Sequence, residues 1–361
     1  MKRRVFLKEI KMAKNYEGTI KACFIGYIVQ AIVNNFTPLL FIRFGTEYNI
    51  PLSEITMLIT VNFLLQLMMD FASAFFIDRI GYKASCLIAH GSCAAGLIAL
   101  AVLPGMFANA YIGLLIAVLM YAVGGGLLEV VISPMVEACP SEHKDKTMSM
   151  LHSFYCWGTV IVIAFSTLFF YFFGIENWKT LSLIWAILPI LNGIAFIFLP
   201  VCSLADGDEE GLSLKELFKT KAFWLFALVI CCAGASEQAI SQWASAFTEQ
   251  ALGISKTVSD LAGPLLFSVL MGISRTIYGK FGERIDLGKM MVASGALCCA
   301  SYMLVSLSPL PALALLGMAV CGFSVGILWP GTYSKAASKI KGGGTTMFAF
   351  LALAGDVGCT G

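Results

Sequence analysis

The chain has 361 residues, of which 58% are hydrophobic and 13% charged, and its mean hydropathy is +0.84. Soluble proteins average about 45–50% apolar and roughly 25% charged residues, so the composition predicts an integral membrane protein with the lipid bilayer as its solvent. The formal net charge of +2 is nearly neutral and gives no indication of a nucleic-acid partner.

A membrane-spanning helix needs about 20 mostly apolar residues. The basic N-terminus leads into an apolar run without a small-residue cleavage site, which favours a retained first span over a signal peptide. Along the whole chain, the apolar runs predict ten complete helices and one partial helix. Their expected ranges are 19–42, 55–77, 84–104, 109–138, 147–173, 180–200, 221–247, 257–279, 289–307, 311–334 and from about 344 onward.

One long polar connection, 201–220, separates the first six predicted spans from the others. It predicts an N-terminal half at 1–200, a cytoplasmic linker at 201–220 and a C-terminal half at 221–361. Compared with the first half, the second is expected to be incomplete, lacking the twelfth helix and part of the eleventh.

The two halves also repeat each other at an offset of about 200 residues. The hexapeptide DRIGYK at 78–83 aligns with GKFGER at 279–284, and Ser133-Pro134 aligns with Trp329-Pro330. Parallel repeats of six helices, related by an axis along the membrane normal, are an architecture of transporters.

The residues around DRIGYK resemble a signature of the major facilitator superfamily, whose loop between spans 2 and 3 typically reads G-x-x-x-D-R-x-G-R-K. This chain keeps Asp78, Arg79, Gly81 and Lys83. The resemblance implies an all-α membrane protein of two pseudo-symmetric six-helix bundles. It also implies that these four residues form a gate on the cytoplasmic side.

Two positions depart from the signature, Ala74 and Tyr82. Asp70 lies two turns before Asp78 on the same helical face, and we expect it to join the gate through Arg79 or through the eleventh span.

Within the superfamily, Leu128-Glu129 followed by Ser133-Pro134, and HSFYCWG at 152–158, resemble the fucose permease group and its sugar-transporting relatives. Members of that group usually show L-E followed by N-P. Its proton-coupled members also carry an acid late in an N-N-x-x-D run of span 1, where this chain has Pro38. The resemblance therefore does not carry the coupling acid over to span 1.

Ionisable groups inside a membrane are costly and are candidate functional sites. Glu129 lies in the middle of span 4 beside three glycines, which were expected to be flexible, and Glu237 begins a polar stripe in span 7. Both are candidates for solute binding and proton coupling; an interhelical hydrogen bond or a packed polar interface is the alternative. For Asp356, between two glycines, close backbone packing is the alternative. His152 is a third proton-coupling candidate, with a satisfied helix-end histidine as its alternative.

Side-chain amides offer donors and acceptors on one face of spans 1 and 2, a mixture that suits hydroxyl-rich solutes. Sugars also stack on aromatic rings, although each tryptophan can equally be a packing residue. Arg43 and Arg275 lie away from the expected midplane, which favours a neutral solute. The residues expected to bind it are Gln30, Asn34, Asn62, Gln66, Glu129, Trp157, Glu237, Gln238, Gln242, Trp243 and Trp329.

The sequence thus favours a multi-pass transporter of the cell membrane that moves a small neutral solute, a sugar by preference, with the proton as a candidate second partner. A multidrug or metabolite exporter and a sugar sensor without transport activity are the alternatives. An enzyme is not expected, because the chain contains no HExxH pair or paired aspartates at catalytic spacing. The twelve cysteines include no CxxC pair, so we expect no metal site and no cofactor.

The distribution of basic residues predicts a cytoplasmic N-terminus. With that orientation, all but three of the 24 lysine and arginine residues lie on the cytoplasmic side, the exceptions being Arg43, Lys179 and Lys256. Asp206→Cys, in the predicted linker, should therefore give no signal with a membrane-impermeant maleimide added to intact cells. Labelling above the wild-type background would contradict this topology.

Overall fold

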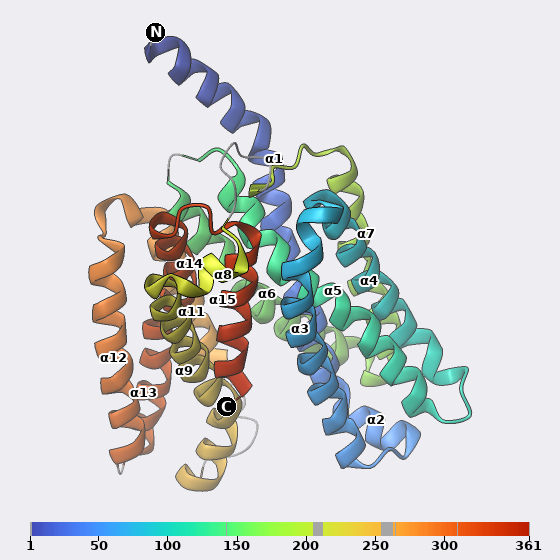
Figure 1. Ribbon diagram of the computed structural model, residues 1–361. Helices are drawn as coiled ribbons and strands as arrows, with labels where there is room; N and C mark the ends of the chain where they lie inside the picture. Colours follow the sequence, from blue (N-terminus) through green and yellow to red (C-terminus); the bar gives the residue numbers. More distant parts are fainter. Residues whose placement is uncertain are drawn as a thin grey trace. The chain divides into compact units, whose positions relative to one another are not determined.

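The computed structural model describes residues 2–141, 143–204, 212–253, 263, 265–308 and 310–360, without the side chains of residues 2–15, 52, 242–252 and 360. Every regular element in these ranges is helical (Figure 1). Residues 205–211 of the polar linker, including Asp206, and the first part of the span expected at 257–279 lie outside the described residues. The predicted all-α membrane fold is confirmed.

The chain divides into two compact units, Met1–Pro140 with Ile161–Asp208, and Ser141–Val160 with Glu209–Gly361. The first unit contains most of the N-terminal helices, and α6 (Lys144–Phe173) begins in the second unit and ends in the first. The helices of the first unit are α1 (Lys2–Asn35), η1 (Thr37–Leu40), α2 (Phe41–Tyr48), α3 (Leu52–Ile80), α4 (Tyr82–Val102), η2 (Leu103–Gly105), α5 (Ala110–Ala138), η3 (Ile175–Asn177) and α7 (Trp178–Phe198). In this unit α5 is central, because it packs against α1, α3 and α4.

In the second unit, α9 and α13 are the central helices. Helix α9 packs against α13, α14 and α15, and α13 packs against α11 and α12. Its helices, besides the start of α6, are α8 (Leu214–Lys219), α9 (Lys221–Leu252), α11 (Leu266–Phe281), η6 (Gly282–Arg284), α12 (Leu287–Leu307), α13 (Pro311–Val325), α14 (Leu328–Lys339) and α15 (Gly344–Thr360). The antiparallel helices α12 and α13 can be followed side by side in Figure 1.

Nine helices in the described part of the chain are long and apolar enough to cross a membrane. Large apolar side chains such as Phe198, Tyr171 and Val292 are exposed along them. Such exposure would be costly in water but matches helices that face hydrocarbon, since lipid tails are as apolar as these side chains. The exposed apolar surface therefore agrees with the membrane assignment.

The two aligned prolines act differently on their helices. Pro134 lies within a continuous α5, whereas α13 ends at Val325 and α14 begins at Leu328, two residues before Pro330. Proline has no backbone N–H, so it cannot bond to the carbonyl four residues earlier. The span expected at 311–334 therefore consists of two helices, and the Gly326 carbonyl is left available to another donor.

Gly81 ends α3 and begins α4 with φ +85° and ψ 150°, a conformation that is nearly restricted to glycine. A Cβ added there would meet no atom within 4 Å, so the cost of a side chain at Gly81 comes from the backbone alone. A Cβ added to Gly91 in α4 would also meet no atom within 4 Å, and Gly91 does not have a positive φ of this kind.

Gly81→Ala should destabilise the protein by about 1–3 kcal/mol because the left-handed conformation strains an L-residue. Thermal unfolding in detergent measures this as a lower Tm. Gly91→Ala is the matched control and should leave the Tm unchanged or slightly raised. Equal Tm values for the two variants would contradict the backbone explanation.

Candidate substrate-binding site

Two hydrogen bonds join α1 and α5 in the first unit. Gln30 donates from Nε2 to Oε2 of Glu129 over 2.8 Å, and the Tyr27 and Ser133 hydroxyls lie 2.8 Å apart. The residue numbers of the bonded pairs increase along α1 while they decrease along α5. The two helices are therefore antiparallel, and the two bonds lie about one turn apart. The structure thus places Glu129 beside the polar face of α1, and its role in a solute site stays a prediction.

The amides of α1 and α3 form a second cluster. Gln66 donates from Nε2 to Oδ1 of Asn34 over 2.8 Å, and Asn62 donates to the same oxygen over 3.5 Å. Asn62 and Gln66 are buried, and Asn34 is partly buried. The amide residues expected to line one site are therefore brought together within the first unit.

Three consecutive glycines of α5 explain how the helices approach this closely. A Cβ added to Gly124 would clash with Cys93 and with the backbone carbonyl of Ala89. One added to Gly125 would lie 3.3 Å from Val33, and one added to Gly126 would lie 2.9 Å from Met69. Each glycine therefore faces a different helix: α4, α1 and α3. Residues 124–126 lie inside the continuous helix α5, where the glycines allow close packing.

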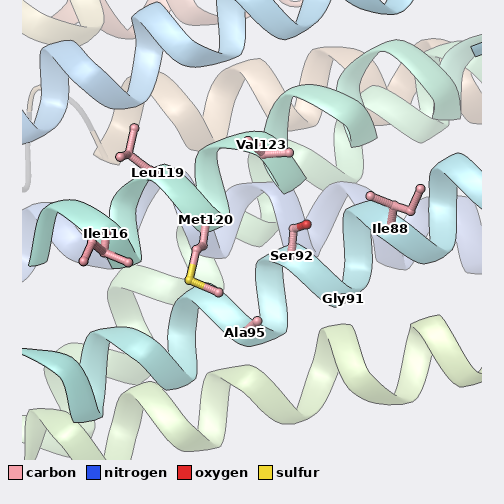
Figure 2. A pocket seen from close by; sticks show the side chains of 8 residues that line it. All are labelled: Ile88, Gly91, Ser92, Ala95, Ile116, Leu119, Met120 and Val123. Atoms are coloured by element: carbon pink, nitrogen blue, oxygen red, sulfur yellow. The ribbon is translucent and has the colours of Figure 1, made fainter. Parts of the chain in front are cut away.

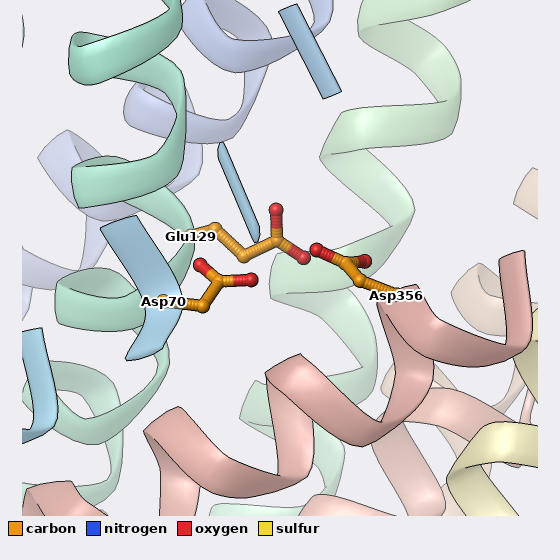
Figure 3. A group of neighbouring side chains, drawn as sticks. All are labelled: Asp70, Glu129 and Asp356. Carbon is orange, nitrogen blue, oxygen red and sulfur yellow. The ribbon is translucent and has the colours of Figure 1, made fainter. Parts of the chain in front are cut away.

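Asp70 lies closer to this site than the sequence suggested. Its side chain is fully buried, and one of its carboxylate oxygens lies within 4.8 Å of one of Glu129. Figure 3 shows the two carboxylates directed toward each other from α3 and α5. Two carboxylates at this distance repel each other when both are ionised, so a bound proton lowers the electrostatic cost. A role of Asp70 in the gate stays a prediction.

In the second unit, Glu237 of α9 forms an ion pair with Arg275 of α11. Nη2 of Arg275 lies 3.1 Å from Oε2 of Glu237, and the side chains are 4% and 20% exposed. Gln238 is partly buried next to Glu237, whereas the side chains of Gln242 and Trp243 lie outside the described residues. The described part of this stripe therefore centres on an ion pair between a partly exposed Glu237 and a buried Arg275.

Two predicted tryptophans have packing partners in the same unit. Trp157 donates from Nε1 to the Thr276 hydroxyl over 3.0 Å and remains partly exposed. Trp329 is only 8% exposed, and its ring covers Gly355 of α15 so closely that any Cβ there would clash. Burial supports the packing interpretation for Trp329, while a solute-binding role of the partly exposed Trp157 stays a prediction.

Glycines of α15 pack in the way expected around Asp356. A Cβ at Gly358 would lie 2.8 Å from the backbone carbonyl carbon of Cys231 on α9. Asp356 itself is partly buried. The glycines therefore allow close helix contact.

His152, the third proton-coupling candidate, is buried in the first half of α6. Its ring lies 5.6 Å from that of Tyr333, between ring centroids, and its backbone carbonyl accepts a hydrogen bond from Arg275. The ring is therefore part of a packed aromatic contact, and its role in proton transfer stays a prediction.

The expected gate residues Asp78, Arg79 and Lys83 are exposed at the α3–α4 connection, and Lys83 donates to the Leu199 carbonyl over 3.3 Å. In the hexapeptide that repeats this segment, Glu283 forms an ion pair of 2.5 Å with Lys146. The hydrogen bond from Lys146 lowers the pKa of the Glu283 carboxyl from its ordinary value, and the charges of Lys146 and His143 contribute further. The second unit thus has its own charged contact at the corresponding position.

A groove of about 610 Å³ lies between α4 and α5 (Figure 2). It is lined by Ile88, Gly91, Ser92, Ala95, Ile116, Leu119, Met120 and Val123. Only one of these side chains is polar, and none belongs to the predicted site. The lining suits hydrocarbon rather than a hydroxyl-rich solute.

Sequence reasoning missed the partnership of Arg275 with Glu237. The sequence signal was an acid and a base in two adjacent predicted spans, at positions 237 and 275. A charge buried in a membrane needs a partner, so the two could have been proposed as a pair. Their contact also depends on how α9 and α11 are rotated about their axes, which residue spacing does not specify.

Comparisons with known proteins agree with this architecture. A profile described as Major Facilitator Superfamily matches residues 23–360. Two structures of the fucose:proton symporter FucP, one of them of the E. coli protein and one in the outward conformation, align with a TM-score of 0.80 at 14% and 12% identity, covering 96% of this chain and 90% of theirs.

The proton:xylose symporter XylE, with bound 6-bromo-6-deoxy-D-glucose, aligns with a TM-score of 0.77 at 12% identity, covering 96% of this chain and 87% of its own. No curated protein matches the chain in sequence. The profile match extends over nearly all of the spans described above. The chain therefore belongs to the major facilitator superfamily of membrane transporters.

Proposed function

We propose that the protein is a secondary active transporter that moves a small neutral solute, a sugar by preference, by alternating access and with proton coupling. The observation that carries the proposal is the contact of Gln30 with Glu129 inside otherwise apolar helices, next to the Asn34, Asn62 and Gln66 amides. Polar groups inside a membrane are expensive and are usually functional. This cluster offers both donors and acceptors, as solute hydroxyls require.

The charges of the second unit also support a neutral solute. Arg275 is paired with Glu237, so this buried pair carries no net charge that would attract an anion. The solved structures with similar folds are described as proton symporters of fucose and xylose, which supports the solute class by analogy of fold.

Flux into sealed proteoliposomes tests the proposal. Radiolabelled L-fucose and D-xylose serve as probes, with and without an inward proton gradient. Uptake that rises with the gradient supports a proton-coupled sugar transporter. Efflux of a lipophilic cation instead would indicate an exporter, and sugar binding without flux would indicate a sensor.

Glu129→Gln should abolish proton-driven accumulation while exchange of solute down its own gradient continues. The amide keeps the shape and the hydrogen bonding but cannot bind and release a proton beside Asp70. Counterflow and gradient-driven uptake are measured on the same proteoliposomes. Glu129→Asp, which keeps a titratable group, is the control and should retain part of the accumulation. Wild-type accumulation by Glu129→Gln would remove Glu129 from the coupling role.

Asp78→Asn should slow transport while the solute affinity changes by less than about threefold, because a gate residue biases the conformational equilibrium without touching the solute. Binding and flux are compared on one preparation. Glu54→Gln, an exposed acid at the other end of α3, is the matched control and should leave both quantities unchanged. An unchanged flux in Asp78→Asn would rule out the gate assignment.

A further inference from the structure

Arg275 is anchored by the proline break of the second unit. Its Nε donates to the Gly326 carbonyl over 2.8 Å, which is the carbonyl that Pro330, four residues later, cannot bond. The residue Arg275 as a whole is 3% exposed. One edge of the guanidinium is therefore fixed by backbone that the helix break makes available.

The first half of α6, which belongs to the same unit, holds a second part of the guanidinium. Nη1 donates to the His152 carbonyl over 3.2 Å and to Sγ of Cys156 over 3.1 Å. Gly272 on α11 permits this close contact, since an added Cβ would lie 3.2 Å from Cβ of Cys156. With Nε and Nη1 occupied in this way, Nη2 is left to bond Glu237.

This arrangement makes Glu237 the counter-charge of Arg275 and fixes the orientation of its carboxylate. An arginine guanidinium is permanently charged, and a buried charge is strongly disfavoured without a counter-charge. Loss of the negative charge on Glu237 would leave Arg275 uncompensated inside the unit. The ion pair therefore argues against Glu237 as the residue that binds a proton in each cycle.

One carboxylate oxygen of Glu237 remains available. Arg275 bonds to Oε2, and among the described residues none donates a hydrogen bond to Oε1. The Glu237 side chain is 20% exposed, in contrast to its buried partner. An oriented and ionised carboxylate oxygen at a partly open position is a strong acceptor for a hydroxyl group.

We propose that Arg275 is a positioning residue which holds Glu237 as a permanent acceptor for a hydroxyl group of a neutral polyol solute, and that Glu237 does not take part in proton coupling. The inference rests on the proposed transport function and deepens it. It assigns the second unit a binding role and leaves the titrating role to the first unit. It also excludes anionic solutes from this position, because an ionised carboxylate repels them.

Equilibrium binding of L-fucose and D-xylose to the purified full chain tests the inference independently of transport. Glu237→Gln should raise the Kd about tenfold or more, as expected for loss of a charged hydrogen-bond acceptor. Arg275→Lys, which keeps the charge but loses the planar fork, should raise it by less. The exposed Glu54→Gln variant is the control and should bind as the wild type does.

The double variant Glu237→Gln with Arg275→Gln separates binding from a purely structural role. Removing both charges leaves no uncompensated buried ion, so its Tm should recover relative to Arg275→Gln. Its sugar affinity should stay as low as that of Glu237→Gln. Recovery of affinity together with Tm would overturn the inference in favour of a structural ion pair.

Gradient-driven uptake completes the test. At saturating sugar, Glu237→Gln should still accumulate solute in response to the proton gradient. Loss of accumulation with an unchanged Kd would make Glu237 the proton carrier and overturn the inference, while the transport function would stand. Absence of sugar binding by the wild-type protein would overturn both.

Discussion

A charge inside an apolar helix must be compensated, and this constraint determines which contacts this protein makes between its helices. In the second unit the requirement is met by the ion pair of Glu237 and Arg275, 3.1 Å apart. In the first unit, Glu129 accepts a hydrogen bond from Gln30 and lies beside another acid, Asp70. The carboxylate of Glu237 is therefore compensated by an ion pair, whereas that of Glu129 accepts a hydrogen bond from a neutral amide.

The difference has a chemical consequence. A guanidinium at hydrogen-bonding distance stabilises a carboxylate in its charged form, whereas a second carboxylate favours a bound proton. This difference underlies the two proposed roles, proton exchange for Glu129 and a permanent hydrogen-bond acceptor for Glu237. Two acids that look equivalent in the sequence become distinct through their neighbours.

Small residues and prolines bring these neighbours into place. The three glycines of α5 let α1, α3 and α4 approach its backbone. Gln30 of α1 bonds the carboxylate of α5, and the amides of α1 and α3 bond each other. Pro330 leaves the Gly326 carbonyl without its usual partner inside the helix, and Arg275 bonds there. In a membrane the backbone groups freed by such breaks must be satisfied by other parts of the protein, and here the donor is a side chain that the candidate site also uses.

By itself, the sequence determined the membrane class, the superfamily fold and the spans. For example, apolar length predicted a helix at 109–138, and α5 occupies Ala110–Ala138. Such predictions succeed because hydrophobic length and a helix's own hydrogen bonds are local properties of the chain. The sequence also identified Glu129 and Glu237 as candidates, since any acid in such a run stands out.

Only the tertiary structure decided which side chains meet. It placed Asp70 beside Glu129, paired Arg275 with Glu237, packed Trp329 onto Gly355 and gave the three glycines of α5 their packing partners. Each of these contacts depends on the rotation and spacing of two helices that are distant in the sequence. A helical pattern gives the face on which a residue lies, but the partner of that face is set by the packing of the whole unit.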